Sequence, residues 1–75
     1  MKLSQLLEVF HGTTILRIAS ADTNNCLFCG ITDDARTKVP GNYLYGEVKL
    51  MYGEYFKDYY HAGISIFVNP RENRH

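Results

Sequence analysis

Two cysteines three residues apart, Cys26 and Cys29, come closest to a chemical motif in this chain. Two thiolates at this spacing can bind one zinc ion, and a structural zinc site needs two further ligands. His11, His61 and His75 are the histidines available to supply them. In a regular strand, however, residues 26 and 29 face opposite sides of the sheet, so both thiols reach one ion only where a bulge interrupts the strand. We therefore expect two small, half-buried packing residues without metal or cofactor, and keep a zinc-stabilised module as an alternative.

The residue types needed for catalysis are present, but not in patterns typical of an active site. A redox-active C-x-x-C begins a helix, whose dipole lowers the thiol pKa, whereas Cys29 is followed by Gly30 and Ile31. A Cys–His pair needs an oriented base and an oxyanion site as well. Asp33 and Asp34 are adjacent and therefore diverge on a helix or a strand. The glycine-rich motifs that bind phosphate are absent from the sequence. We predict a protein without catalytic residues that is not an enzyme.

Aromatic side chains are concentrated in one segment, because all six tyrosines lie within residues 43–60. Each ring buries about 150–250 Å², more in total than one helix and one sheet face can hide. Tyr52 shares the parity of Val48 and Leu50, so we expect it in the core. Tyrosine is enriched at protein interfaces, where it adds contact area at little entropic cost. We predict a protein-binding surface formed by Tyr45, Tyr55, Phe56, Tyr59, Tyr60 and His61.

The charge balance favours a protein partner over nucleic acid. Eight basic residues match eight acidic residues, so the net charge is zero and a strongly basic face is not expected. Within the aromatic segment, Lys49 and Lys57 are cancelled by Glu47, Glu54 and Asp58. Little repulsion opposes self-association, so a homo-oligomer is compatible with this composition. Binding of single-stranded nucleic acid through stacked rings is the other alternative.

Apolar periodicity predicts one amphipathic helix at the N-terminus and several short strands. Leu3, Leu6, Leu7 and Phe10 share a helical face. Ser4 is expected to cap this helix, and a left-handed glycine at position 12 to end it. Alternation and β-branched residues predict strands over 13–19, 26–31, 47–52 and 64–68, the last one central because it is almost entirely apolar.

The intervening segments contain turn residues. Thr32 can cap a single helical turn over residues 32–37, and Pro40 and Gly41 indicate a turn. Residues 53–63 fit either a β-loop or a helical turn. These elements predict an α+β fold, in which the N-terminal helix packs on a small, mainly antiparallel sheet of about four strands in two layers. We expect a single domain over residues 1–75, with residues 70–75 as a frayed tail.

No apolar run in the sequence is long enough to cross a bilayer, and the N-terminus lacks the apolar core of a signal peptide. We therefore expect a cytoplasmic protein without membrane contact, whose thiols stay reduced.

The N-terminal pattern LSQLLEVF followed by HGTTILRI, in residues 3–18, resembles many short α+β proteins encoded by phages and mobile elements of Gram-positive bacteria. These proteins often open with an L-x-x-LL-x-V helix that leads into a strand. The resemblance implies an accessory or inhibitor protein that acts on a host bacterial protein complex. It implies no catalytic residues.

Overall fold

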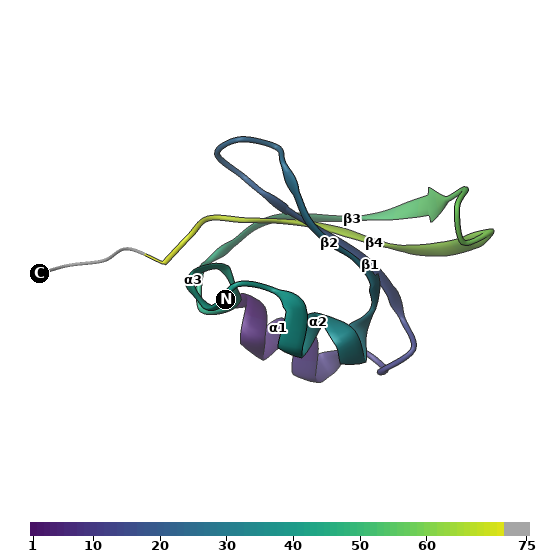
Figure 1. Cartoon of the computed structure of the whole chain (residues 1–75), viewed down its shortest axis with the longest axis horizontal. Helices are drawn as coiled ribbons and strands as arrows, with labels where there is room; N and C mark the ends of the chain where they lie inside the picture. Colours follow the sequence, from purple (N-terminus) through teal and green to yellow (C-terminus); the bar gives the residue numbers. More distant parts are fainter. Residues whose placement is uncertain (72–75) are drawn as a thin grey trace, which may run out of the picture.

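The computed structural model describes residues 1–71 of the chain and shows a small α+β fold (Figure 1). A short helix precedes a four-stranded mixed sheet, and two further short helices lie between its strands in the chain. Of the predicted tail, residues 72–75 lie outside the described residues. The elements are α1 (Leu3–Val9), β1 (Ile15–Ser20), β2 (Cys26–Ile31), α2 (Thr32–Lys38), α3 (Gly41–Leu44), β3 (Val48–Phe56) and β4 (His61–Val68).

The strand order in the sheet is β2-β1-β4-β3, and every neighbouring pair is antiparallel except β1 with β4, which is parallel. The predicted four-stranded, mainly antiparallel sheet is therefore confirmed. The almost entirely apolar β4 lies between two neighbours, as its composition predicts. The parallel pairing runs from Leu16 opposite Ile64 to Ser20 opposite Val68.

The core lies between the sheet and the helices, which all cover the same face of the sheet (Figure 1). Fully burying a leucine or isoleucine side chain contributes about 1.5–3 kcal/mol relative to leaving it exposed. The large apolar side chains that are almost completely buried come from α1, β1 and β4, and they are Leu3, Leu7, Leu16, Ile18, Ile66 and Val68. On the opposite face, the part of the chain that the structure describes forms no second layer, and we call this side of the sheet the uncovered face.

The ends of α1 differ from the prediction. The helix begins after Lys2, whose backbone N–H donates to the Gln5 side chain, so Ser4 lies inside the first turn and does not cap it. The helix ends at Val9 because Phe10 is already extended. Gly12 is not left-handed; instead, its missing side chain leaves room for the Asp33 carboxylate, and its carbonyl accepts the Asp33 backbone N–H at 3.0 Å.

Residues 32–38 form the helix α2, slightly longer than the predicted turn. Thr32 does not cap it, because the Thr32 hydroxyl donates to the Thr14 carbonyl at 2.9 Å. This bond fixes the start of α2 to the segment that leads into β1. The predicted turn around Gly41 is the short helix α3.

The ambiguous residues 53–63 continue β3 and β4 into a long hairpin, with residues 57–60 as its tip. A bulge between Val48 and Leu50 breaks the alternation at the start of β3. Val48 therefore lies on the helix side, whereas Leu50 and Tyr52 turn to the uncovered face and are 52% and 42% exposed. The prediction that Tyr52 belongs to the core with Leu50 is wrong, because the bulge changes the side to which they point.

Gly46 sits where the chain passes from α3 to β3, and its replacement tests how tightly this junction is packed. A Cβ at Gly46 would overlap the Asn69 carbonyl oxygen, whereas a Cβ at Gly53 meets no atom within 4 Å. We expect Gly46→Ala to lower the free energy of unfolding by about 2 kcal/mol or more, and Gly53→Ala to change it by less than about 0.5 kcal/mol. Urea unfolding of both variants measures this difference, and equal losses would contradict it.

Candidate functional site

Exposed apolar side chains are concentrated on the β3–β4 hairpin. Of the nine exposed large hydrophobic residues in the described chain, six lie in residues 50–60. Their exposed fractions range from 42% for Tyr52 to 85% for Tyr60. We call these six residues the hairpin surface: Leu50, Met51, Tyr52, Tyr55, Tyr59 and Tyr60.

The residues of the predicted protein-binding surface do not form one patch. Tyr45 precedes β3 and so lies at the opposite end of that strand from the hairpin tip. Phe56 is only 9% exposed, because its ring packs against the backbone of Gly63, so it is a packing residue and its assignment to a binding surface is wrong. His61 is exposed and pairs with Phe56 where the hairpin closes.

Tyr55 and Tyr59 are both exposed, but they lie on different sides of the hairpin. Tyr55 pairs with Ala62 of β4, and both residues lie on the helix side of the sheet. Tyr59 lies on the other side, where its hydroxyl reaches β2. Sequence reasoning missed Leu50 as a surface residue, because the bulge that turns it to the uncovered face is not visible in the sequence of one strand.

β3 is an edge strand with both faces largely open beyond the bulge. It is nine residues long, and its first residue, Val48, donates its N–H to the Met1 carbonyl at 2.9 Å; beyond Val48, β3 pairs only with β4 among residues 1–71. The helices pack mainly on β1, on β2 and on one another. One side of β3 therefore presents a row of unpaired backbone N–H and C=O groups, flanked by exposed side chains on both faces. Such an edge is able to pair with another extended chain.

A polar cluster lies on the uncovered face next to this edge. Arg17 Nη1 is 3.7 Å from Glu54 Oε1. The other Glu54 carboxylate oxygen and the Ser65 hydroxyl are both buried without a hydrogen-bond partner among residues 1–71. Ser65 is only 1% exposed, and it lies between Arg17 on β1 and Tyr52 on β3. Buried polar atoms are nearly always hydrogen-bonded, so these two oxygens are unusual.

A hydrogen bond from Tyr59 connects the hairpin tip to β2, at the opposite edge of the sheet from β3. The Tyr59 hydroxyl donates to the Cys29 carbonyl at 3.2 Å. The pKa of Tyr59 is raised above its ordinary value, first by the charge that the Cys29 thiol carries when ionised, and then by desolvation. A negative charge near a phenol opposes the loss of the phenolic proton.

The two cysteines lie on the same face of the sheet, contrary to the prediction from strict alternation. A bulge at Ile18 and Ala19 places Cys26 opposite Ala19 and Cys29 opposite Arg17. Both thiols are free, and both residues are exposed rather than half-buried.

The candidate metal ligands do not come together in the structure. Among residues 1–71, no group of three or more His, Cys, Asp or Glu side chains is placed to hold a metal ion. His11 and His61 thus do not join Cys26 and Cys29 in a metal site. His75 lies outside the described residues.

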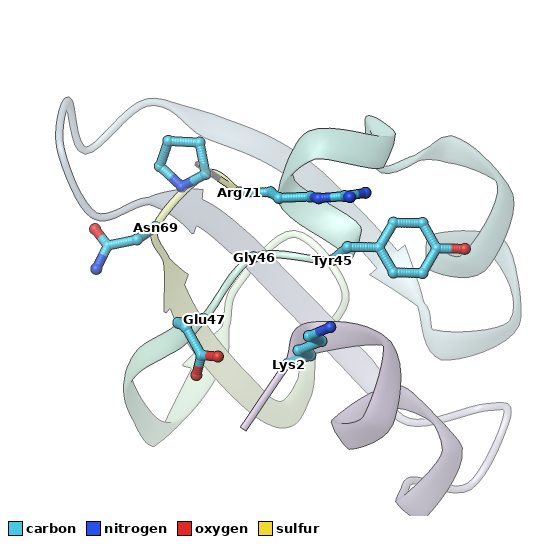
Figure 2. Close-up of a pocket in the computed structure, with 7 residues that line it drawn as sticks. Lys2, Tyr45, Gly46, Glu47, Asn69 and Arg71 are labelled. Atoms are coloured by element: carbon cyan, nitrogen blue, oxygen red, sulfur yellow. The ribbon is translucent and has the colours of Figure 1, made fainter. Parts of the chain in front are cut away.

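A cavity of about 360 Å³ lies at the other end of β3 (Figure 2). In this view the Arg71 side chain runs in the same direction as that of Tyr45, and the Glu47 carboxylate is directed away from Arg71. Glu47 Oε2 lies 2.9 Å from the amino group of Met1. The cavity is lined by Lys2, Tyr45, Gly46, Glu47, Asn69, Pro70 and Arg71.

Replacement of Ser65 tests whether its buried hydroxyl is unpaired in solution. The matched control is Ser20, which is equally buried and whose hydroxyl is within 3.3 Å of both the Tyr43 hydroxyl and the Asp22 backbone N–H. We expect Ser20→Ala to lower the free energy of unfolding by about 1 kcal/mol, whereas Ser65→Ala leaves it unchanged or raises it by up to about 1 kcal/mol. Urea unfolding measures both. A loss at Ser65 as large as that at Ser20 would show that the hydroxyl is satisfied.

The contact between Tyr59 and Cys29 predicts a pH dependence. Because the pKa of Tyr59 is raised by folding, its neutral phenol supports the fold below pH 10, and that support is lost as the pH rises through the folded-state pKa. We expect Cys29→Ala to lower the pKa of Tyr59, and Cys26→Ala to lower it less, because Cys26 is the weakest of the named contributions. Titration of ¹³C-labelled tyrosine rings by NMR resolves the two variants. An unchanged Tyr59 pKa in Cys29→Ala would contradict the contact.

Comparisons with known proteins provide no relative from which a function can be transferred. No family model matches the chain, and no match was found among curated proteins or among solved structures. Within the described residues, no helix is both long and apolar enough to span a membrane. Function is therefore inferred from the side chains and the sheet edge of this chain.

Proposed function

We propose that this chain is a non-enzymatic protein-binding module that binds an extended segment of its partner along the β3 edge. The observation that supports this proposal most directly is the hairpin surface, which holds six of the nine exposed large apolar side chains of residues 1–71. Large exposed apolar patches on small proteins commonly mark interaction sites.

Strand addition fits this surface better than a flat contact does. A partner strand next to β3 satisfies the unpaired backbone groups of the edge, and its alternate side chains meet both faces of the sheet. Leu50 and Tyr52 are available on the uncovered face, and Met51 and Tyr55 on the helix side. The backbone bonds supply affinity, and the tyrosine rings supply rigid contact area.

The charges along the hairpin favour a protein over nucleic acid. Residues 47–58 carry two lysines, Lys49 and Lys57, against the three acids Glu47, Glu54 and Asp58. Binding to a phosphate backbone depends on clustered cations, which this surface lacks. The zinc-stabilised alternative has no third ligand among residues 1–71 to support it.

We extend the proposal to a cellular role through the N-terminal resemblance. In this role the module acts in the cytoplasm as a phage or mobile-element accessory protein or inhibitor, and its partner is a host bacterial protein complex. The two exposed free thiols are compatible with a reducing compartment.

Paired substitutions on the two faces of β3 test the proposed binding mode. We expect Leu50→Ser with Tyr55→Ser to weaken partner binding at least about tenfold, because each truncated anchor contributes on the order of 1 kcal/mol or more. Both side chains are more than half exposed, so the fold should persist. Val9→Ser, which removes an exposed apolar side chain from α1, is the matched control and should bind like the wild type.

The measurement combines capture from a lysate of the native host with a test on the purified partner. In the complex, hydrogen exchange should slow at the backbone amides of residues 50–56, which is the signature of strand addition. Protection confined to another element, equal capture by the double variant, or no capture by the wild type would contradict the proposal. Light scattering on the pure protein shows whether a second copy of the chain is the partner.

A further inference from the structure

Three segments that are distant in the sequence meet at the cavity of Figure 2, and backbone hydrogen bonds hold them together. The Leu3 N–H donates to the Gly46 carbonyl at 3.1 Å, and the Asn69 N–H donates to the Glu47 carbonyl at 2.9 Å. The Arg71 N–H donates to the Asn42 carbonyl at 2.6 Å. Hydrogen bonds between backbone groups therefore hold the walls of the cavity in place. Gly46 packs so closely on Asn69 that no side chain fits at position 46.

The charges around this cavity are predominantly positive. Its lining contains Lys2, Arg71 and Glu47. The Glu47 carboxylate forms an ion pair with the amino group of Met1. Within residues 1–71, neither Lys2 nor Arg71 forms an ion pair with a carboxylate. Two cations thus line the same cavity, and the one acid in its lining, Glu47, already pairs with the Met1 amino group.

We propose that this cavity binds the phosphate monoester group of a small organic molecule. The group is close to doubly charged at neutral pH and has oxygens on several sides, so it can contact Lys2 and Arg71 at the same time. Arginine binds phosphate through two parallel hydrogen bonds, and lysine contributes a point charge. A single carboxylate carries one charge and presents both oxygens at one end, which matches two cations less well.

The size of the cavity and the position of Tyr45 indicate a ligand larger than inorganic phosphate. A volume of about 360 Å³ lies at the lower end of the range for small-molecule sites. Tyr45 lines the cavity together with Lys2 and Arg71 and is 48% exposed, so its ring offers an aromatic surface to the organic part of the ligand. This site is separate from the hairpin surface and goes beyond the proposed protein-binding function.

Titration of the ¹⁵N-labelled chain with AMP, inorganic phosphate and acetate at constant ionic strength tests the proposal. We expect saturable shifts of the Gly46, Glu47 and Asn69 amides with AMP and with phosphate, tighter binding of AMP, and no saturable shift with acetate. Lys2→Gln with Arg71→Gln should weaken AMP binding about tenfold or more, because charge-assisted hydrogen bonds are lost. Tyr45→Ala should weaken AMP binding but leave phosphate binding unchanged.

The matched control removes two lysine charges elsewhere, as Lys38→Gln with Lys57→Gln, and should bind AMP like the wild type. Equal weakening in this control would show a general charge effect and overturn the site. Shifts that fail to saturate, that spread over the whole chain, or that are the same with acetate would also overturn it. If the Lys2/Arg71 double variant does not fold, Arg71→Gln alone replaces it, and unchanged AMP affinity in that variant counts against the proposal.

Discussion

The parallel contact between β1 and β4 is the interaction on which the rest of the structure depends. It joins Leu16 and Ile18 to Ile64 and Ile66, which are separated by almost fifty residues of chain. Three of these four side chains are completely buried. Because these two strands occupy the centre of the sheet, each of the other strands can only add to an outer side, β2 beside β1 and β3 beside β4. The positions of both edges follow from this one pairing.

The helices do not cover the whole width of the sheet, and this creates the exposed edge. They contact mainly β2, β1 and one another. α2 packs on β2 and β1, so the far edge at β3 stays open. The exposed aromatic residues are thus a consequence of the layer geometry as well as of composition.

Much of the fold could be predicted from the sequence, because periodicity reports directly on which residues a helix or strand can bury. The bounds of β2, the central place of β4 and the buried leucines of α1 are examples. The prediction from alternation was wrong at the two bulges. One bulge puts Cys26 and Cys29 on the same face of the sheet, and the other turns Tyr52 to the surface. A bulge is a property of two paired strands, so a single strand's sequence does not reveal it. The cavity was not predictable either, because its residues come from three distant segments.

The segment that contains all six tyrosines is compact in the sequence but extended in space. Tyr45 precedes β3 and Tyr59 follows it, so a nine-residue strand that rises about 3.3 Å per residue separates them in the chain. If the same residues formed a helix, the rise would be about 1.5 Å per residue, and rings on one side would stack on successive turns. Substitutions more than about 10 Å apart without shared partners act independently. One aromatic run therefore contributes to two surfaces, the β3 edge and the Tyr45 cavity, and a change at either should leave the other intact.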